Sequence, residues 1–153
     1  MSDLVITRVF DAPRALVWKA WTDPEHMKRW WGPGGFTSPT CTMDVRVGGR
    51  YHWCMRSPDG KEYWNTGVFQ ELVPLEKIVY TDNFADEIGN VVPASHYGIP
   101  VDMPRDNVVT VTFVEHGGKT TMTLRHAMPP GIMGEMTLKG WNGSFDKLAL
   151  TLR

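Results

Sequence analysis

Cysteine is scarce in this sequence: there are two, Cys41 and Cys54, among 153 residues. Two cysteines cannot build the disulfide framework of a small secreted domain, and these two lack the CxxC spacing of a zinc or redox site. His52 stands two residues before Cys54, but a structural zinc ion needs four ligands. The sequence therefore predicts free thiols and no metal site.

Long apolar runs and an excess of one charge are also missing. No stretch approaches the roughly 18 apolar residues that span a bilayer, and the first residues do not resemble a signal peptide. The 16 Lys and Arg residues nearly balance the 17 Asp and Glu, and no basic cluster is present that would bind nucleic acid. We expect a soluble cytoplasmic protein with neither nucleic acid nor a membrane as its partner.

Catalytic signatures are absent as well. The sequence has no GxSxG, no HExxH and no glycine-rich phosphate loop, and Gly48-Gly49 is better explained as a hairpin turn. It also has no internal repeat, low-complexity tract or linker that would separate domains. We therefore predict one domain over residues 1–153, with no cofactor, and these absences lean against enzymatic activity.

The sequence is rich instead in aromatic residues and methionine, with seven Trp, six Phe, four Tyr and nine Met. Tryptophan is bulky and carries an N–H group that needs a partner, so a compact core seldom uses so many. Two interpretations remain open. These side chains pack a core, or several of them line a cavity for an apolar ligand.

The first part of the chain predicts a strand and two short helices. Residues 4–10 are rich in β-branched and aromatic side chains, which favour a strand. Pro13 suits the first turn of a helix over 14–21. Asp23 followed by proline suits the start of a second helix, which must end at the glycine and proline after Trp31.

From residue 36 onwards, apolar residues alternate with polar ones, as in half-buried strands. Turn residues divide this region into strands within 36–56, 63–73, 77–81, 108–114 and 120–126. The alternation directs Tyr51, Trp53 and Met55 toward the core. It leaves the inward face of 63–73 and of 77–81 open.

Residues 132–152 carry an apolar stripe at helical spacing, about 30 Å long at 1.5 Å per residue. Gly140 lies within the stripe and costs about 1 kcal/mol relative to Ala, so it requires either a close backbone approach or room for a ligand. The predicted fold class is α+β. We expect a curved antiparallel sheet of six to seven strands wrapped on a long C-terminal helix, with two short helices after the first strand.

Five segments resemble the START-like helix-grip superfamily, of the polyketide cyclase or SRPBCC type. Within it, they are similar to the bacterial branch related to the C-terminal domain of the activator of the heat-shock protein 90 ATPase. The segments cover nearly the whole chain and are VFDAPRALVWKAWTDPEHMKRWWGP (9–33), MDVRVGGRYHW (43–53), GVFQELVPLEKIVYTD (67–82), TVTF with the EHGGKT turn (110–120) and GWNGSFDKLALTL (140–152). The first is the most specific, because the pair Trp30-Trp31 follows DPE and precedes glycine and proline.

The resemblance implies a deep cavity between the sheet and the long helix, which the superfamily uses for lipids, sterols, polyketides or plant hormones. Our leading expectation is that the cavity binds a hydrophobic or aromatic small molecule without chemistry. One alternative is a protein-interaction domain of the chaperone-activator type, acting in a stress response, although we expect no second module before this domain. Another is a small cyclase or aromatase. We expect a monomer or a homodimer.

The predicted ligand-binding residues are those that the two short helices, strand alternation, the helical stripe and the long connection place toward the interior. They are Trp18, Trp21, Trp30, Trp31, Tyr51, Trp53, Met55, Phe84, Tyr97, Phe113, Met122, Leu124, His126, Met133, Met136 and Trp141. No residue is assigned as catalytic, but His126, Asp82 and His96 are candidates. A histidine beside a carboxylate in an apolar pocket can act as a general base.

Residues 82–107 have no clean period and exceed the usual limit of about 12–15 residues for structureless loops. Such long connections are often lids or binding loops. Two interpretations remain open here as well. The segment is a surface excursion, or it is a lid that closes the cavity with His96-Tyr97-Gly98.

Overall fold

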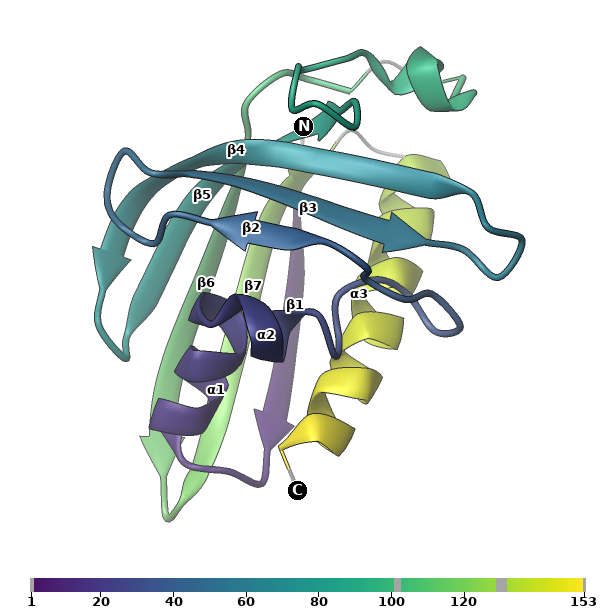
Figure 1. Ribbon diagram of the computed structural model, residues 1–153. Coiled ribbons are helices and arrows are strands. Elements are labelled where there is room, and N and C mark those ends of the chain that lie inside the picture. The colour runs from purple at the N-terminus through teal and green to yellow at the C-terminus, as the bar shows by residue number, and fades with distance from the viewer. Residues whose placement is uncertain (1, 101–102, 129–131, 153) are drawn as a thin grey trace.

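The computed structural model describes residues 2–100, 103–128 and 132–152 (Figure 1). A seven-stranded antiparallel sheet curves around a long C-terminal helix, and two short helices follow the first strand. In chain order the elements are β1 (Ser2–Phe10), α1 (Arg14–Thr22), α2 (Pro24–Met27), β2 (Cys41–Met43), β3 (Arg50–Arg56), β4 (Glu62–Val73), β5 (Lys77–Ala85), the 3-10 helix η1 (Ala94–Tyr97), β6 (Asn107–His116), β7 (Lys119–Met128) and α3 (Ile132–Thr151). The predicted α+β helix-grip fold is confirmed.

The strands lie in the order β1-β7-β6-β5-β4-β3-β2. The first strand of the chain therefore pairs with the last, and β2 forms the opposite edge. Ile6 of β1 pairs with Leu124 of β7, which pairs with Val111 of β6, and all three side chains are buried. Because side chains alternate along a strand, this register gives one apolar face to the core and one face to solvent.

Strand β5 is longer than the sequence indicated. The alternation of apolar residues stops at Thr81, where Asp82 and Asn83 follow, and the prediction ended the strand there. In the structure β5 runs on because the long β4 continues beside it, pairing Trp64 with Ala85. A strand that turns a polar side chain inward, toward a cavity, cannot be recognised from apolar alternation alone.

Helix α2 is shorter than predicted. The carboxylate of Asp23 caps it by accepting the Glu25 N–H at 3.0 Å, as the sequence indicated. The regular helix ends at Met27, and the chain continues as a tight turn in which the Trp30 N–H donates to the Met27 carbonyl at 3.2 Å. This turn still buries Trp30 and Trp31.

Most of the tryptophans pack against one another and against tyrosine. The rings of Trp21 and Trp30 lie 4.8 Å apart, and Trp53 lies 4.6 Å from Trp31 and 3.8 Å from Tyr51, measured between ring centroids. All five side chains are at most 8% exposed. These rings therefore fill part of the space between the sheet and α3.

Helix α3 contacts the chain segment after α2 at Gly143, not at Gly140. A Cβ atom at Gly143 would lie 2.8 Å from the backbone nitrogen of Gly34, closer than real contacts allow. At Gly140 it would meet only the Cγ of Pro33, at an ordinary 3.6 Å. The close approach is thus three residues further along the helix than Gly140, which borders a cavity instead.

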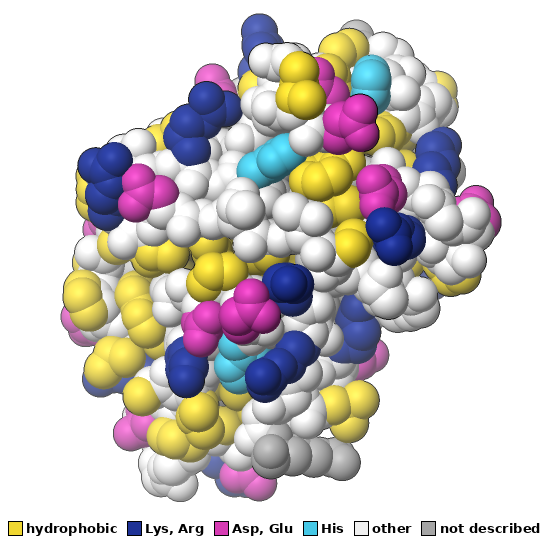
Figure 2. Space-filling model, viewed as in Figure 1, with side chains coloured by type: hydrophobic (Ala, Val, Ile, Leu, Met, Phe, Trp, Pro, Cys, Tyr) yellow, Lys and Arg dark blue, Asp and Glu magenta, His cyan; other side chains and the backbone are white. Residues whose placement is uncertain are grey.

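The surface carries charges of both signs. Figure 2 shows acidic and basic side chains next to one another across one face, without a large patch of either sign. In the described ranges, none of the helices has both the length and the apolar character needed to cross a membrane.

Candidate functional site

A cavity of about 600 Å³ lies between the sheet, α3 and the connection from β5 to β6. This connection passes over one end of the sheet and the start of α3 in Figure 1. Strands β3 to β7 supply one wall, α3 the opposite wall, and the connection the cover. Most of the lining side chains are apolar, so the cavity suits an apolar body.

Two tryptophans separate the cavity from the packed core. The rings of Trp31 and Trp141 meet edge to face, with centroids 5.4 Å apart, and both residues line the cavity. Trp141 comes from α3 and Trp31 from the turn after α2, so two segments far apart in sequence form this wall. The packed aromatic core holds the wall in place from behind.

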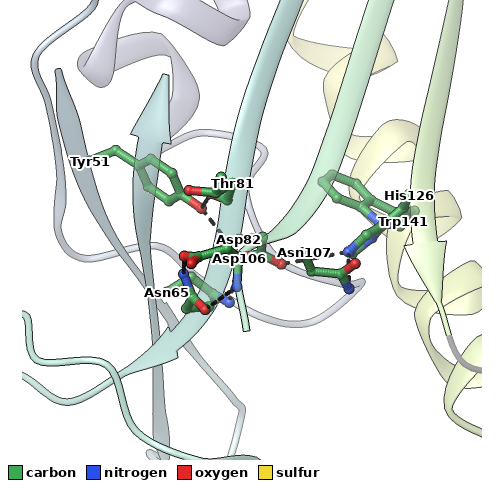
Figure 3. Close-up of polar contacts among 9 residues, drawn as sticks. Tyr51, Asn65, Thr81, Asp82, Asp106, Asn107, His126 and Trp141 are labelled. Carbon is green, nitrogen blue, oxygen red and sulfur yellow. Dashed lines mark hydrogen bonds and ion pairs between the residues drawn. The ribbon is translucent and has the colours of Figure 1, made fainter. Parts of the chain in front are cut away.

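The polar end of the cavity is built around Asp82 (Figure 3). Its Oδ1 accepts a hydrogen bond from the Asn65 amide at 3.2 Å and lies 3.2 Å from the Tyr51 hydroxyl. Its Oδ2 lies 3.7 Å from Nε2 of His126. Both residues line the cavity, and the Asp82 side chain is 22% exposed against 5% for His126, so the carboxyl is the more accessible member of the pair.

The hydrogen bonds around His126 determine where its proton lies. The indole N–H of Trp141 can only donate, and it donates to Nδ1 of His126 at 3.1 Å. A neutral His126 therefore carries its proton on Nε2, which faces the Asn107 amide at 3.3 Å and the carboxyl of Asp82. The structure places the amide nitrogen of Asn107 there, so a hydrogen bond with a protonated Nε2 requires the amide to be turned over, with its oxygen accepting.

Burial shifts both members of the pair toward their neutral forms. It raises the pKa of the Asp82 carboxyl, and the proximity of His126 with the contacts from Tyr51 and Asn65 only partly offsets this. It lowers the pKa of His126, against the opposing influence of Asp82. Both shifts therefore disfavour an ion pair between Asp82 and His126.

Hydrogen bonds of Tyr97 and Asn83 hold the connection from β5 to β6 in place over the cavity. The hydroxyl of Tyr97 accepts a hydrogen bond from the Trp64 N–H at 3.1 Å and donates to the carbonyl of Ala85. At the other end of the connection, the Asn83 side chain donates to Asp106 at 3.0 Å and accepts its backbone N–H at 2.7 Å. Residues 91–94 and Tyr97 of this segment line the cavity, whereas His96 and Gly98 of the predicted lid are not among its lining residues.

The structure places the predicted ligand-binding residues in two groups. One group lines the cavity: Trp31, Met55, Phe84, Tyr97, His126, Met136 and Trp141. The other packs in the core outside the cavity lining: Trp18, Trp21, Trp30, Tyr51, Trp53, Phe113, Met122 and Leu124. The side chain of Met133 lies outside the described residues.

Of the three candidate proton-transfer residues, two lie close together and the third lies apart. Asp82 and His126 face each other at the cavity, whereas His96 is exposed and packs edge-on against Tyr97, 4.9 Å between ring centroids. Within the described ranges, no group of three or more His, Cys, Asp or Glu side chains is placed to hold a metal ion.

Two polar cavity residues, Asn65 and Asn107, were not predicted from the sequence. Asn107 stands two residues before Val109, so extending the alternation of β6 by one step places it on the inner face. Asn65 lies on the same face as Phe69, but a bulge after Phe69 made the inward face of β4 ambiguous. Strand alternation therefore places both residues on the inner face, but a search for inward apolar residues misses them because they are polar.

Comparison with protein families identifies the group to which this fold and cavity belong. The family model of Activator of Hsp90 ATPase homolog 1-like protein matches residues 11–153. The chain belongs to this family. The resemblance seen in the sequence is thus confirmed, and the match includes every element that forms the cavity. No curated protein matched the sequence.

Solved structures of similar fold cover almost the whole chain of this family member. Protein CV1439 from Chromobacterium violaceum is 30% identical, with a TM-score of 0.79 over 98% of this chain and 96% of that one. A protein from Arthrobacter aurescens is 27% identical, with a TM-score of 0.81 over 98% and 85%. The AHSA1 protein from Silicibacter pomeroyi is 22% identical and shares the fold, with a TM-score of 0.76 over 99% and 97%.

Proposed function

We propose that this protein binds a hydrophobic small molecule with an aromatic or polycyclic body in the cavity between the sheet and α3. The observation that carries the proposal is the cavity itself. Its volume of about 600 Å³ lies within the range of small-molecule sites, roughly 300–1,000 Å³, and its lining is mainly apolar with a few polar groups at one end.

The ring geometry supports an aromatic ligand. Trp31 and Trp141 present an edge-to-face pair at the inner wall, while Phe84 and Tyr97, 5.8 Å apart between centroids, line the covered side. Aromatic pairs gain about 0.5–1.5 kcal/mol beyond the area that they bury. A flat apolar body between these walls would contact rings on both sides.

A cavity-filling substitution tests the proposal. Gly140 lines the cavity and its missing Cβ has space, so Gly140→Leu places a side chain inside the cavity. We expect tryptophan-fluorescence titration against lipid, polyketide and polycyclic aromatic panels to find a ligand for the wild type, and Gly140→Leu to weaken its binding at least about tenfold. The neighbouring Lys139→Leu is the control, because Lys139 is exposed and does not line the cavity.

Native mass spectrometry of the protein purified from its host supplies a second measurement. A retained small molecule, lost in Gly140→Leu and kept in Lys139→Leu, supports the proposal. If no molecule is retained and none of the panels binds, the cavity is not a ligand site and the proposal fails.

The pair of His126 and Asp82 favours a second candidate function, proton transfer in a small cyclase or aromatase. Nε2 of His126 lies 3.7 Å from Oδ2 of Asp82, and the carboxyl faces the cavity. A carboxyl with a raised pKa beside a neutral histidine can accept or donate a proton. Turnover of a bound ligand that persists unchanged in both His126→Ala and Asp82→Asn would exclude this role.

A further inference from the structure

The polar end of the cavity restricts the charge of what can bind there. Asp82, His126 and Arg105 are the only Asp, Glu, His, Lys or Arg residues among the described cavity-lining residues. Arg105 is exposed and belongs to the covering connection, whereas Asp82 lies at the polar end beside the nearly buried His126. A head group beside Asp82 therefore meets a carboxyl on which no Lys or Arg acts, because the one cationic residue in the described lining, Arg105, is not among the groups that shift its pKa.

Asp82 has room for one more hydrogen bond. Its Oδ1 already faces Tyr51 and Asn65, both at 3.2 Å. The Tyr51 hydroxyl lies closer to the Thr81 carbonyl, at 2.7 Å, and its single proton serves that shorter bond. Among the residues that the structure describes, Oδ2 has only the 3.7 Å contact with Nε2 of His126, which exceeds hydrogen-bond length.

A carboxylate ligand is a poor match for this position. Two carboxyl groups that share a site cannot both ionise without strong repulsion, and one of them must take up a proton. An ammonium ligand matches only the ionised form of Asp82. A hydroxyl group matches both forms, because it donates to a carboxylate and accepts from a carboxylic acid.

We infer that the ligand of this cavity is a neutral molecule with a hydroxyl group, an alcohol or a phenol, which it places against Oδ2 of Asp82 while its apolar body lies along Trp31 and Trp141. This inference rests on the proposed function and adds the chemical class of the ligand. It assigns Asp82 as the residue that selects a hydroxyl over a carboxylate.

Three pyrene derivatives of equal ring size separate body from head group. 1-Hydroxypyrene, pyrene and 1-pyrenecarboxylate share four fused rings and differ in hydrogen bonding and charge. At neutral pH, we expect the wild type to bind 1-hydroxypyrene more tightly than pyrene and at least about tenfold more tightly than 1-pyrenecarboxylate. This selectivity is measured on the wild type, so it does not depend on the folding of a variant.

The variant Asp82→Asn tests whether this carboxyl is the cause. It removes the charge but keeps the oxygen that faces Tyr51 and Asn65, so we expect the preference for 1-hydroxypyrene over 1-pyrenecarboxylate to shrink at least about threefold. Asp3→Asn is the control, because Asp3 is exposed on β1 and does not line the cavity. It should leave the preference unchanged.

The outcomes separate the two proposals. Equal affinity for the three compounds, or a preference that Asp82→Asn leaves unchanged, overturns the assignment of a hydroxyl ligand while the cavity remains a binding site. No binding of any of the three overturns this assignment together with the proposal of a polycyclic aromatic ligand.

Discussion

At the scale of single residues, two neighbouring buried tyrosines differ in how their hydroxyl groups are satisfied. Tyr51 and Tyr80 are each 1% exposed, and their rings meet edge to face at 5.4 Å. The Tyr51 hydroxyl donates to the Thr81 carbonyl at 2.7 Å, whereas no hydrogen-bond partner for the Tyr80 hydroxyl is found among the described residues. A buried polar group without a partner costs free energy that its removal returns.

We therefore expect opposite effects from the same substitution at these two positions. Tyr80→Phe should raise the free energy of unfolding by up to about 1 kcal/mol, because it removes an unsatisfied hydroxyl and keeps the ring. Tyr51→Phe should lower it by about 1–2 kcal/mol, because it leaves the Thr81 carbonyl without its donor. Urea unfolding at neutral pH measures both. A loss of stability in Tyr80→Phe equal to that in Tyr51→Phe would contradict this account.

The candidate site shows how far single residues can be placed from sequence. Strand parity directed His126 inward, and it faces the cavity beside Asp82. The partner of its Nδ1 is Trp141 on α3. It could not be identified, because the periodicity of a helix or of a strand does not determine how the helix packs on the sheet. The orientation of a side chain is local information, whereas its hydrogen-bond partner is not.

At the scale of elements, the contact between α3 and the segment after α2 depends on one glycine. Gly143→Ala would bring a Cβ atom to 2.8 Å from the Gly34 nitrogen and force the helix away, so we expect a loss of about 1–3 kcal/mol of unfolding free energy. Gly140→Ala on the same helix meets only the Pro33 side chain at 3.6 Å. It should stabilise the protein by up to about 1 kcal/mol, since alanine favours a helix.

Thermal unfolding of both variants, followed by circular dichroism, measures this difference. The pair is matched, because both substitutions add one methyl group to the same helix. If Gly143→Ala unfolded at the wild-type temperature or above it, the close approach of α3 to Gly34 would be disproved.

The order and type of the elements could be read from the sequence, but their ends could not. Periodicity identified the strands and α3, and Asp23 identified the start of α2. Strand β5 extended to Ala85 because β4 pairs with it there, which is a contact between segments about 20 residues apart. A strand or helix ends where the segment that packs or pairs with it ends, and a single sequence does not identify that segment.

At the scale of the whole molecule, the aromatic residues serve two purposes that composition could not separate. Both interpretations of the seven tryptophans hold in part: Trp21, Trp30 and Trp53 pack the core, while Trp31 and Trp141 also line the cavity. A ring that faces the interior can pack in the core or border the cavity. The boundary between the two is set by how closely α3 approaches the sheet along its length, which is a property of the assembled fold.

This division predicts a gradient of stability along α3. Toward its C-terminal end, Phe145 and Leu148 are fully buried in the core, whereas Met136 and Leu138, nearer the cavity, are 59% and 39% exposed. Segments with few buried contacts open locally, at a lower free energy than global unfolding. In native-state hydrogen exchange, we expect amides near Phe145 to exchange only through global unfolding, and amides near Leu138 at a free energy at least about 2 kcal/mol lower.

Two substitutions provide the check on this gradient. Phe145→Leu should lower the exchange free energy near Phe145 together with that of Val109 and Val111 in β6, because all of these belong to one core. Leu138→Ala should leave the exchange free energies near Phe145 and in β6 unchanged, because Leu138 lies in the part of α3 that opens locally. Uniform protection along α3, or equal effects of the two substitutions, would mean that the cavity end is as firmly packed as the core.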